Sequence, residues 1–341
     1  MSDSSALNLT LATAALAISR RFNYKIEDST ECLTYYTASL QEINQRLQDP
    51  KESASDGVVG TILGFACFDT NIGNWDRWKL HMSGLQKIIK VRGGLQSFLG
   101  LHILQTTILW VDVAGSLILD TVPRFELPQI SSIEPELHHS PRILTFVQKW
   151  ETQYPELVDI RDNLFSLASL ARHANSSATS NNLSQDGTFI CIRLHSVAHG
   201  FLCMSRDIQP AVAYSNYPGS AIREALRLTS ILFIAMIKKH HGVVPSGVPE
   251  CKLRLSQFLT QVAVDWSSFM DLHLWVLMIG ALAEKNGRLW YVSEISATMR
   301  EMGLIKWDDL LDVVKDIIWI NEILDEDAEM LREEVIGSQL N

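Results

Sequence analysis

Four residues of types that often bind metals follow one another at intervals of four along the sequence. They are Cys191, His195, His199 and Cys203. On a helix such residues share one face, so His195 and His199 could hold a zinc ion together. All four cannot surround one ion, because Cys191 and Cys203 would lie about 18 Å apart along the helix axis. His195 and His199 are thus candidate metal ligands without a third ligand, and a face of small, half-buried residues is the alternative that we favour.

The rest of the sequence offers no arrangement typical of catalysis or of cofactor binding. No glutamate follows either histidine as in the H-E-x-x-H motif, where it is the general base of zinc hydrolases. The pairs His138-His139 and His240-His241 are adjacent, so their side chains diverge and cannot chelate one ion. The glycine-rich phosphate loops and the G-x-S-x-G motif are absent. The sequence therefore predicts no enzyme and no cofactor.

The elements that would position these residues are helices. Apolar residues recur at alternating intervals of three and four, as in the stripe Leu33, Tyr36, Leu40, Ile43 and Leu47. Asp28 and Glu31 form a candidate cap before this helix, and Asp49-Pro50 would end it. Few stretches alternate with a period of two, so we predict an all-α protein, an irregular array of packed antiparallel helices in one large domain. Further helices are expected at 7–18, 54–68, 75–89, 102–119, from 142, from 156, and at 189–206, 221–240, 252–264, 267–284, 292–302 and 308–334.

One internal segment lacks the apolar residues that a packed helix needs. Residues 175–187 are rich in Ser and Asn and cannot bury enough surface to offset the cost of ordering. We therefore expect a flexible loop at 174–187 between an N-terminal helical half, residues 1–173, and a C-terminal half, residues 188–341.

Composition limits the classes of partner. With 47% apolar residues the chain can build a large core, and its formal net charge of −10 repels nucleic-acid backbones and anionic membranes. No basic run exceeds two residues, and the most apolar windows are too short to span a bilayer, so no membrane association is expected. The five cysteines are scattered, which favours buried thiols in a reducing compartment over disulfides.

Two motifs in order resemble a known family. The first is Trp75-x-x-Trp78-x-x-His81-x-x-Gly84 followed by Arg92-Gly93-Gly94, and the second is Trp110 and Asp112 followed by Pro123-Arg124-Phe125. Their order and separation resemble the fungal-specific transcription factor domain, the helical region that follows the two-zinc, six-cysteine DNA-binding cluster in fungal regulators. The resemblance is clearest over residues 7–125.

The resemblance implies a nuclear regulator whose helical domain responds to protein partners or to small molecules, often in control of a metabolic pathway. Five cysteines cannot build a six-cysteine cluster, and none of them shows C-x-x-C spacing. Direct zinc-cluster DNA binding is therefore not expected from these residues. The open alternatives are a shortened gene product, a relative that lost the cluster, and a regulator that acts through a DNA-binding partner.

The first motif is best interpreted as architecture. Trp75, Trp78, His81 and Leu85 would lie along one helix face, and Gly84 would let another helix approach closely. Gly93-Gly94 would end the helix, because glycine adopts the left-handed conformation easily.

The second motif is also best interpreted as structural. Trp110 would be a buried aromatic, and Asp112 and Arg124 a charge pair that fixes the corner at Pro123. The alternative is that Arg124 binds a ligand carboxylate, since guanidinium groups suit this role.

The last predicted helix mixes acidic and apolar residues. Residues 308–334 contain eleven acidic and two basic residues. This mixture is typical of transcriptional activation segments, but an ordinary amphipathic closing helix with a solvated acidic face is the interpretation that we favour.

The leading hypothesis is thus a transcriptional regulator or co-regulator that acts through protein contacts in the nucleus. The alternatives are a cytoplasmic helical ligand-binding or interaction protein that has left transcription, and an enzyme that uses a metal held by His195 and His199.

Overall fold

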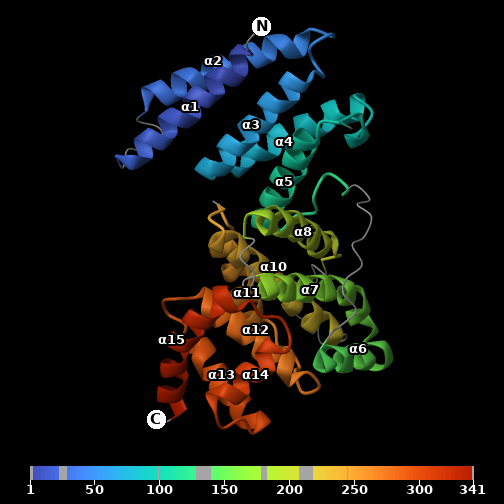
Figure 1. Ribbon diagram of the computed structural model, residues 1–341, viewed down its shortest axis with the longest axis vertical. Coiled ribbons are helices and arrows are strands. Elements are labelled where there is room, and N and C mark those ends of the chain that lie inside the picture. The colour runs from blue at the N-terminus through green and yellow to red at the C-terminus, as the bar shows by residue number, and fades with distance from the viewer. Residues whose placement is uncertain are drawn as a thin grey trace. The chain divides into compact units, whose positions relative to one another are not determined.

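Helices form every regular element in the part of the chain that the structure describes. This computed structural model covers residues 3–22, 29–98, 100–127, 140–177, 183–206, 218–243 and 245–339. Fourteen α-helices, two short 3-10 helices and no strand occur there (Figure 1). The predicted all-α class is confirmed.

The contacts between residues divide the chain into two compact units. Unit 1 comprises residues 1–115 and 124–126, and unit 2 comprises residues 116–123 and 127–341. The division falls inside α5 (His102–Leu119). The halves predicted on either side of 174–187 stay a prediction.

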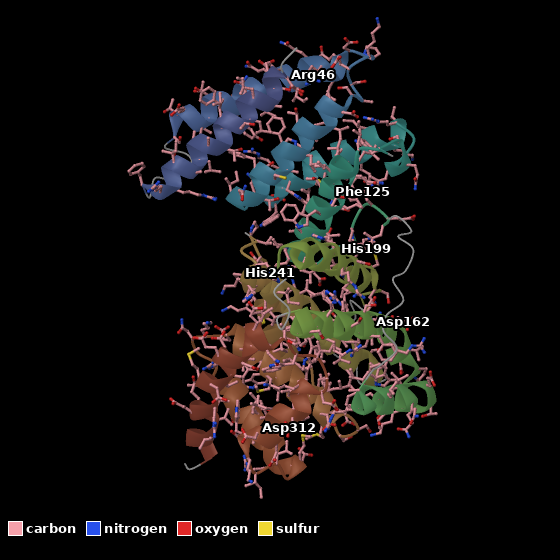
Figure 2. The ribbon with its side chains drawn as sticks, in the orientation of Figure 1. Arg46, Phe125, Asp162, His199, His241 and Asp312 are labelled. Carbon is pink, nitrogen blue, oxygen red and sulfur yellow. The ribbon has the colours of Figure 1, made fainter. Side chains whose placement is uncertain are left out.

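Unit 1 is built from helical hairpins. Its helices are α1 (Ser4–Arg21), α2 (Thr30–Gln48), α3 (Asp56–Ile72), α4 (Trp75–Val91), the 3-10 helix η2 (Leu95–Phe98) and the first part of α5. Side chains of Asp3, Ser29, Ser55 and Asn74 cap the first four helices by accepting a backbone N–H. Arg46, near the end of α2 (Figure 2), pairs with Asp3 Oδ2 at 2.7 Å and ties the two helices of the first hairpin together.

The apolar stripe predicted on residues 33–47 is rotated in the structure. The buried residues of α2 are Cys32, Tyr36, Ser39 and Ile43. Leu33 and Leu47 are exposed, because the face toward α1 accepts the small side chains of Cys32 and Ser39 at close range. The cap is Ser29, and Asp28 lies outside the described residues. The end at Asp49 is as predicted.

Two almost wholly buried helices, α10 (Pro218–His240) and α12 (Met270–Ala283), lie in the core of unit 2. Its elements after α5 are α6 (Pro141–Gln153), η3 (Pro155–Ile160), α7 (Arg161–Ser177), α8 (Leu183–Cys203), α10 (Pro218–His240), α11 (Val248–Gln261), α12 (Met270–Ala283), α13 (Leu289–Met302), α14 (Trp307–Lys315) and α15 (Asn321–Gln339). In α12 the buried residues point in every direction, as expected of a helix in the centre of a core. Within the described ranges, no helix is both long and apolar enough to cross a membrane.

Three predicted elements of unit 2 differ in the structure. The helix predicted from Glu156 begins as a 3-10 turn and becomes α-helical only at Arg161. The helix predicted at 308–334 is two helices, since α14 ends at Lys315 and α15 begins at Asn321, with the apolar, buried residues 317–320 between them.

The predicted loop at 174–187 is helical wherever it is described, as α7 reaches Ser177 and α8 starts at Leu183. Residues 178–182 lie outside the described residues. Asn175 has a structural role: its Nδ2 donates to the carbonyl of Trp319 and its Oδ1 accepts the N–H of Asn321, both at 2.9 Å. The amide thus fixes the break between α14 and α15, a role that composition could not reveal.

Candidate functional site

Helix α4, which contains the first family motif, is fixed in unit 1 by its tryptophan. Trp78 is completely buried, and its ring lies under the guanidinium of Arg124, whose Cζ is 4.7 Å from the ring centroid. The ring also lies against Gly115 of α5, where an added Cβ would be 2.6 Å from Cη2 and closer to other ring atoms. Trp75 meets Trp78 edge to face at 6.3 Å. These contacts make the motif part of the scaffold.

The glycine that permits close packing is Gly115, and the prediction for Gly84 is wrong. A Cβ added at Gly84 would find no atom within 4 Å. The reason is that Gly84 lies away from the Trp78 face of α4, so no helix backbone approaches it. The end of the helix is as predicted, since Gly93 and Gly94 both have left-handed backbone angles, φ 101° and 88°.

Arg92 closes the C-terminal end of α4 through side-chain contacts. Its Nη2 pairs with Asp56 Oδ1 at 2.6 Å, its Nη1 donates to the carbonyl of Ala54 at 3.0 Å, and its Cζ lies 4.2 Å from the centroid of the Phe98 ring. These contacts hold the start of α3 and the η2 turn against the end of α4, so Arg92 is part of the scaffold.

The second motif forms the predicted charge pair. Buried Asp112 accepts the backbone N–H of Arg124 at 2.6 Å and that of Phe125 at 3.0 Å, and Arg124 Nη1 lies 3.5 Å from its Oδ1. Burial raises the pKa of Asp112, while these bonds oppose the rise. Pro123 is buried, but Trp110 is 37% exposed, so the prediction of a buried aromatic there is wrong. The helix turn that holds Asp112 inward directs Trp110 outward.

A second buried carboxylate lies beside the motif helix. Asp69 of α3 is fully buried, with Arg77 Nη2 2.6 Å from Oδ1 and His81 Nε2 3.3 Å from Oδ2. Burial raises the pKa of Asp69 to about 6 although Arg77 opposes the rise. Burial and the charge of Arg77 lower the pKa of His81 to about 4, and its ring stacks on Phe65. At neutral pH, Arg77 is therefore the cation beside Asp69.

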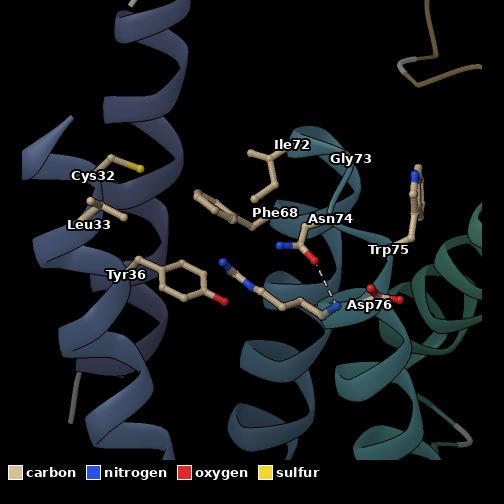
Figure 3. Close-up of a pocket in the computed structure, with 10 residues that line it drawn as sticks. Cys32, Leu33, Tyr36, Phe68, Ile72, Gly73, Asn74, Trp75 and Asp76 are labelled. Atoms are coloured by element: carbon tan, nitrogen blue, oxygen red, sulfur yellow. Dashed lines mark hydrogen bonds between the residues drawn. The ribbon is translucent and has the colours of Figure 1, made fainter. Parts of the chain in front are cut away.

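An open pocket of about 700 Å³ adjoins this pair (Figure 3). Its lining comes from α2, the end of α3, the α3–α4 turn and the first turn of α4, namely Cys32, Leu33, Tyr36, Phe68, Ile72, Gly73, Asn74, Trp75, Asp76 and Arg77. The cap bond from the Arg77 N–H to Asn74 Oδ1, 3.1 Å, holds the start of α4 at the pocket edge (Figure 3). The Arg77 Cζ lies 4.3 Å from the centroid of the Tyr36 ring. This pocket is the candidate functional site.

Sequence reasoning missed this site although a signal for it exists. Asp69 follows a run of apolar residues in a helix, and an acid inside such a run requires a buried cation as partner. Arg77 occupies a position between the motif residues that the family pattern leaves open. Only the structure brings the two together.

Comparison with known families identifies the family to which these motifs belong. A model of the fungal-specific transcription factor domain matches residues 1–306 of the 341. The chain belongs to this family. The match confirms the resemblance and extends far beyond residues 7–125. Neither a curated protein nor a solved structure matched the chain.

The fungal-specific transcription factor domain is a family of transcriptional regulators and not of enzymes. The candidate metal ligands therefore have no catalytic role to fill. His195 and His199 lie on α8, and the Cys203 Sγ is 3.4 Å from His199 Nδ1 (Figure 2). Where the structure describes side chains, no three His, Cys, Asp or Glu residues gather as a metal site. The Cys191 side chain lies outside this part.

Of the other two histidine pairs, the structure describes only His240-His241. His138 and His139 lie outside the described residues. His240 Nε2 is 3.3 Å from Glu322 Oε1, and its ring meets that of His241 edge to face. The pair ends α10 of this transcription factor domain and contacts α15.

Proposed function

We propose that this domain regulates transcription in the nucleus by binding other regulatory proteins, and that it controls genes of a metabolic pathway. The observation that supports the proposal is the family match over residues 1–306. DNA contact in this proposal comes from a partner or from a zinc cluster outside these 341 residues, because five cysteines cannot form the six-cysteine cluster.

The roles of the motif residues are consistent with a regulator rather than a catalyst. The ring of Trp78 contacts the guanidinium of Arg124, and the carboxylate of Asp112 accepts backbone N–H groups of Arg124 and Phe125. Side chains used in this way stabilise a rigid body that presents surfaces to partners.

The acidic segment contributes to this body and is not a free activation peptide in the proposal. Its apolar side chains, including Leu310, Val314, Trp319, Leu324 and Leu331, are buried in unit 2. Activation segments need such side chains exposed to a partner, so any activation should come from the folded domain.

A tethering assay tests the proposal. The full chain is fused to a heterologous DNA-binding domain, and transcription of a reporter is measured with a basal and with an active promoter. We expect a several-fold change in one of them, because a folded regulatory domain recruits its partners wherever it is tethered.

The matched control uses the two glycines of the motif region. Gly84→Ala should leave the reporter effect intact, because the added methyl meets no atom, whereas Gly115→Val should abolish it by displacing Trp78. Unchanged transcription from both promoters with folded wild-type fusion, or residence of the untethered protein only in the cytosol, would favour the alternative of a ligand-binding protein outside transcription.

A further inference from the structure

We propose that the pocket lined by α2 and the α3–α4 turn binds a small organic acid, with its carboxylate on Arg77 and its apolar body between Phe68, Ile72 and Leu33. The inference goes beyond regulation by protein contacts, and its test in solution does not depend on any role in transcription.

The guanidinium of Arg77 has unused donors. Its Nη2 lies 2.6 Å from Asp69, and its face lies over the Tyr36 ring. The Tyr36 hydroxyl is its other polar neighbour, and in the described part of the chain neither Nε nor Nη1 forms a hydrogen bond of regular geometry. A guanidinium presents five N–H donors in a planar fork that matches a carboxylate, so the outer edge of Arg77 can accept a second carboxylate.

Tyr36 adds a second polar group that lacks a partner. Its side chain is buried, and its hydroxyl forms no hydrogen bond of regular geometry in the described part of the chain, because Arg77, its polar neighbour, lies over the ring. Burial, aided by Asp69 and opposed by Arg77, raises the pKa of Tyr36 to about 12, so the phenol keeps its proton and can donate it to an acceptor. Buried polar groups are normally satisfied, and a ligand oxygen in the pocket would satisfy this one.

The walls and the size of the pocket favour an organic ligand. Phe68 is buried, Leu33 is 47% exposed although apolar, and Ile72 and Trp75 complete the apolar lining (Figure 3). A volume of about 700 Å³ lies in the range of roughly 300–1,000 Å³ that is common for small-molecule sites.

The charges select among possible ligands. A cation is disfavoured because Arg77 would repel it at short range, while the other acid of the lining, Asp76, is 95% exposed and pairs with Lys79 at 3.4 Å. An inorganic anion such as phosphate is disfavoured because it has no apolar body for the lining side chains, and because Asp69, against the same guanidinium, repels each further charge. A monocarboxylate with an apolar body satisfies both conditions.

Binding of such an acid should be linked to a proton. The titratable groups that face Asp69 are Tyr36 from α2 and Arg77 and His81 from α4. The pKa of Asp69 is already about 6, and a second carboxylate on Arg77 would raise it further. The complex would therefore take up a proton near pH 6 to 7, and affinity would increase as the pH falls through this range.

Calorimetric titration of the full chain tests the inference. The probes are indole-3-acetate, benzoate and hexanoate, with indole-3-acetamide as the uncharged counterpart and inorganic phosphate as an anion without an apolar body. We expect at least one carboxylate to bind at least tenfold more tightly than indole-3-acetamide and phosphate, and in buffers of different ionisation enthalpy we expect proton uptake at pH 6.5.

Variants locate the site. Arg77→Gln should weaken carboxylate binding at least tenfold, whereas Arg92→Gln, in the same region but bound to Asp56 and Ala54, should leave it unchanged. If Arg77→Gln does not fold, the double variant Asp69→Asn/Arg77→Gln removes both charges of the pair. Tyr36→Phe removes only the hydroxyl. Each of these variants should weaken carboxylate binding. The inference is overturned if none of the three carboxylates binds to folded wild-type protein at millimolar concentration, if amide or phosphate binds equally well, or if these variants leave carboxylate affinity unchanged.

Discussion

Units 1 and 2 each hold an aspartate against an arginine, but the two pairs differ in how completely they are hydrogen-bonded. In unit 2, Asp120 accepts from Arg227 Nη1 and Nη2 at 2.8 and 2.9 Å and from Arg206 Nη2 at 3.2 Å. These bonds lower the pKa of Asp120 although burial alone would raise it. In unit 1, Asp69 meets Arg77 at one short contact, and burial raises its pKa to about 6.

The arginines show the same difference. Arg227 also donates to Glu224 from Nε at 2.8 Å and from Nη2 at 2.7 Å, so each of its three nitrogens has a carboxylate partner. In Arg77 only Nη2 lies against a carboxylate, and its side chain lies over the Tyr36 ring and lines a pocket. The comparison shows that a closed network stabilises the fold, whereas an open one beside a cavity is suited to binding.

The closed network of unit 2 requires an unusual backbone conformation at Asp120. This residue has a left-handed backbone, φ 52°, at the end of α5, where glycine is the usual residue, and the N–H of Thr121 bonds to the carbonyl of Ser116 at 3.0 Å. An aspartate tolerates this conformation and supplies the carboxylate that Arg227 requires. The helix therefore ends at Leu119, as the sequence predicted.

The largest effect is expected from opening the closed network. Arg227→Met would leave the partly buried Asp120 and Glu224 without their main cation, which should lower the free energy of unfolding by up to about 3–5 kcal/mol in urea denaturation. Arg77→Met should cost less, because Asp69 can take up a proton near its raised pKa. Equal losses for the two variants would contradict the distinction between the networks.

A smaller effect is expected from the two glycines of unit 1. Gly115→Ala would force the Trp78 ring to move and should lower the unfolding free energy by about 1–3 kcal/mol. Gly84→Ala, in open space within α4, should raise it by about 0.5–1 kcal/mol. Thermal or urea denaturation measures both changes. A Gly115→Ala protein with the same unfolding free energy as the wild type would show that the Trp78 ring does not lie against Gly115.

The pH dependence of stability distinguishes Asp69 from two partly buried histidines, His81 of unit 1 and His273 of unit 2. The raised pKa of Asp69 means that its contribution to stability is present below about pH 4 and is lost as the pH rises to about 6. His81, with its pKa lowered to about 4, contributes in the opposite direction, and so does His273 of unit 2. In the wild type the effects of Asp69 and His81 oppose each other.

Asp69→Asn removes one side of this balance. Stability of the variant should fall more steeply than that of the wild type on acidification from pH 6.5 to 4, by on the order of 1–2 kcal/mol over the range. Asp162→Asn, whose side chain is 79% exposed, is the control and should not change the slope. Parallel urea series that give the same slope for Asp69→Asn and wild type would refute the raised pKa.

The smallest effect is expected from two tyrosines. Tyr36→Phe in unit 1 removes a buried hydroxyl without a partner and should change stability by less than about 1 kcal/mol, in the stabilising direction. Tyr154→Phe in unit 2 removes a bond of 3.0 Å to Ser268 Oγ and should destabilise by about 1 kcal/mol. A destabilised Tyr36→Phe would mean that the hydroxyl is already satisfied.

The helices and the family could be predicted from the sequence because local patterns determine them. The apolar period, the cap at Asp49 and the glycines at 93 and 94 all act within a few residues. The face that α2 buries, the seat of Trp78 on Gly115 and the role of Asn175 depend on residues far apart in the chain, so no local pattern reveals them. The candidate site belongs to the second kind, since Asp69, Arg77 and Tyr36 come from three helices.

The most direct test of the account is chromatin crosslinking of the tagged, full-length protein in its native cells, followed by sequencing of the recovered DNA. A regulator that acts on chromatin directly or through a partner predicts enrichment at a discrete set of promoters, with altered transcripts from those genes when the gene for the protein is deleted. Protein that is present and folded, yet recovers no promoter above background and leaves transcripts unchanged on deletion, would contradict it.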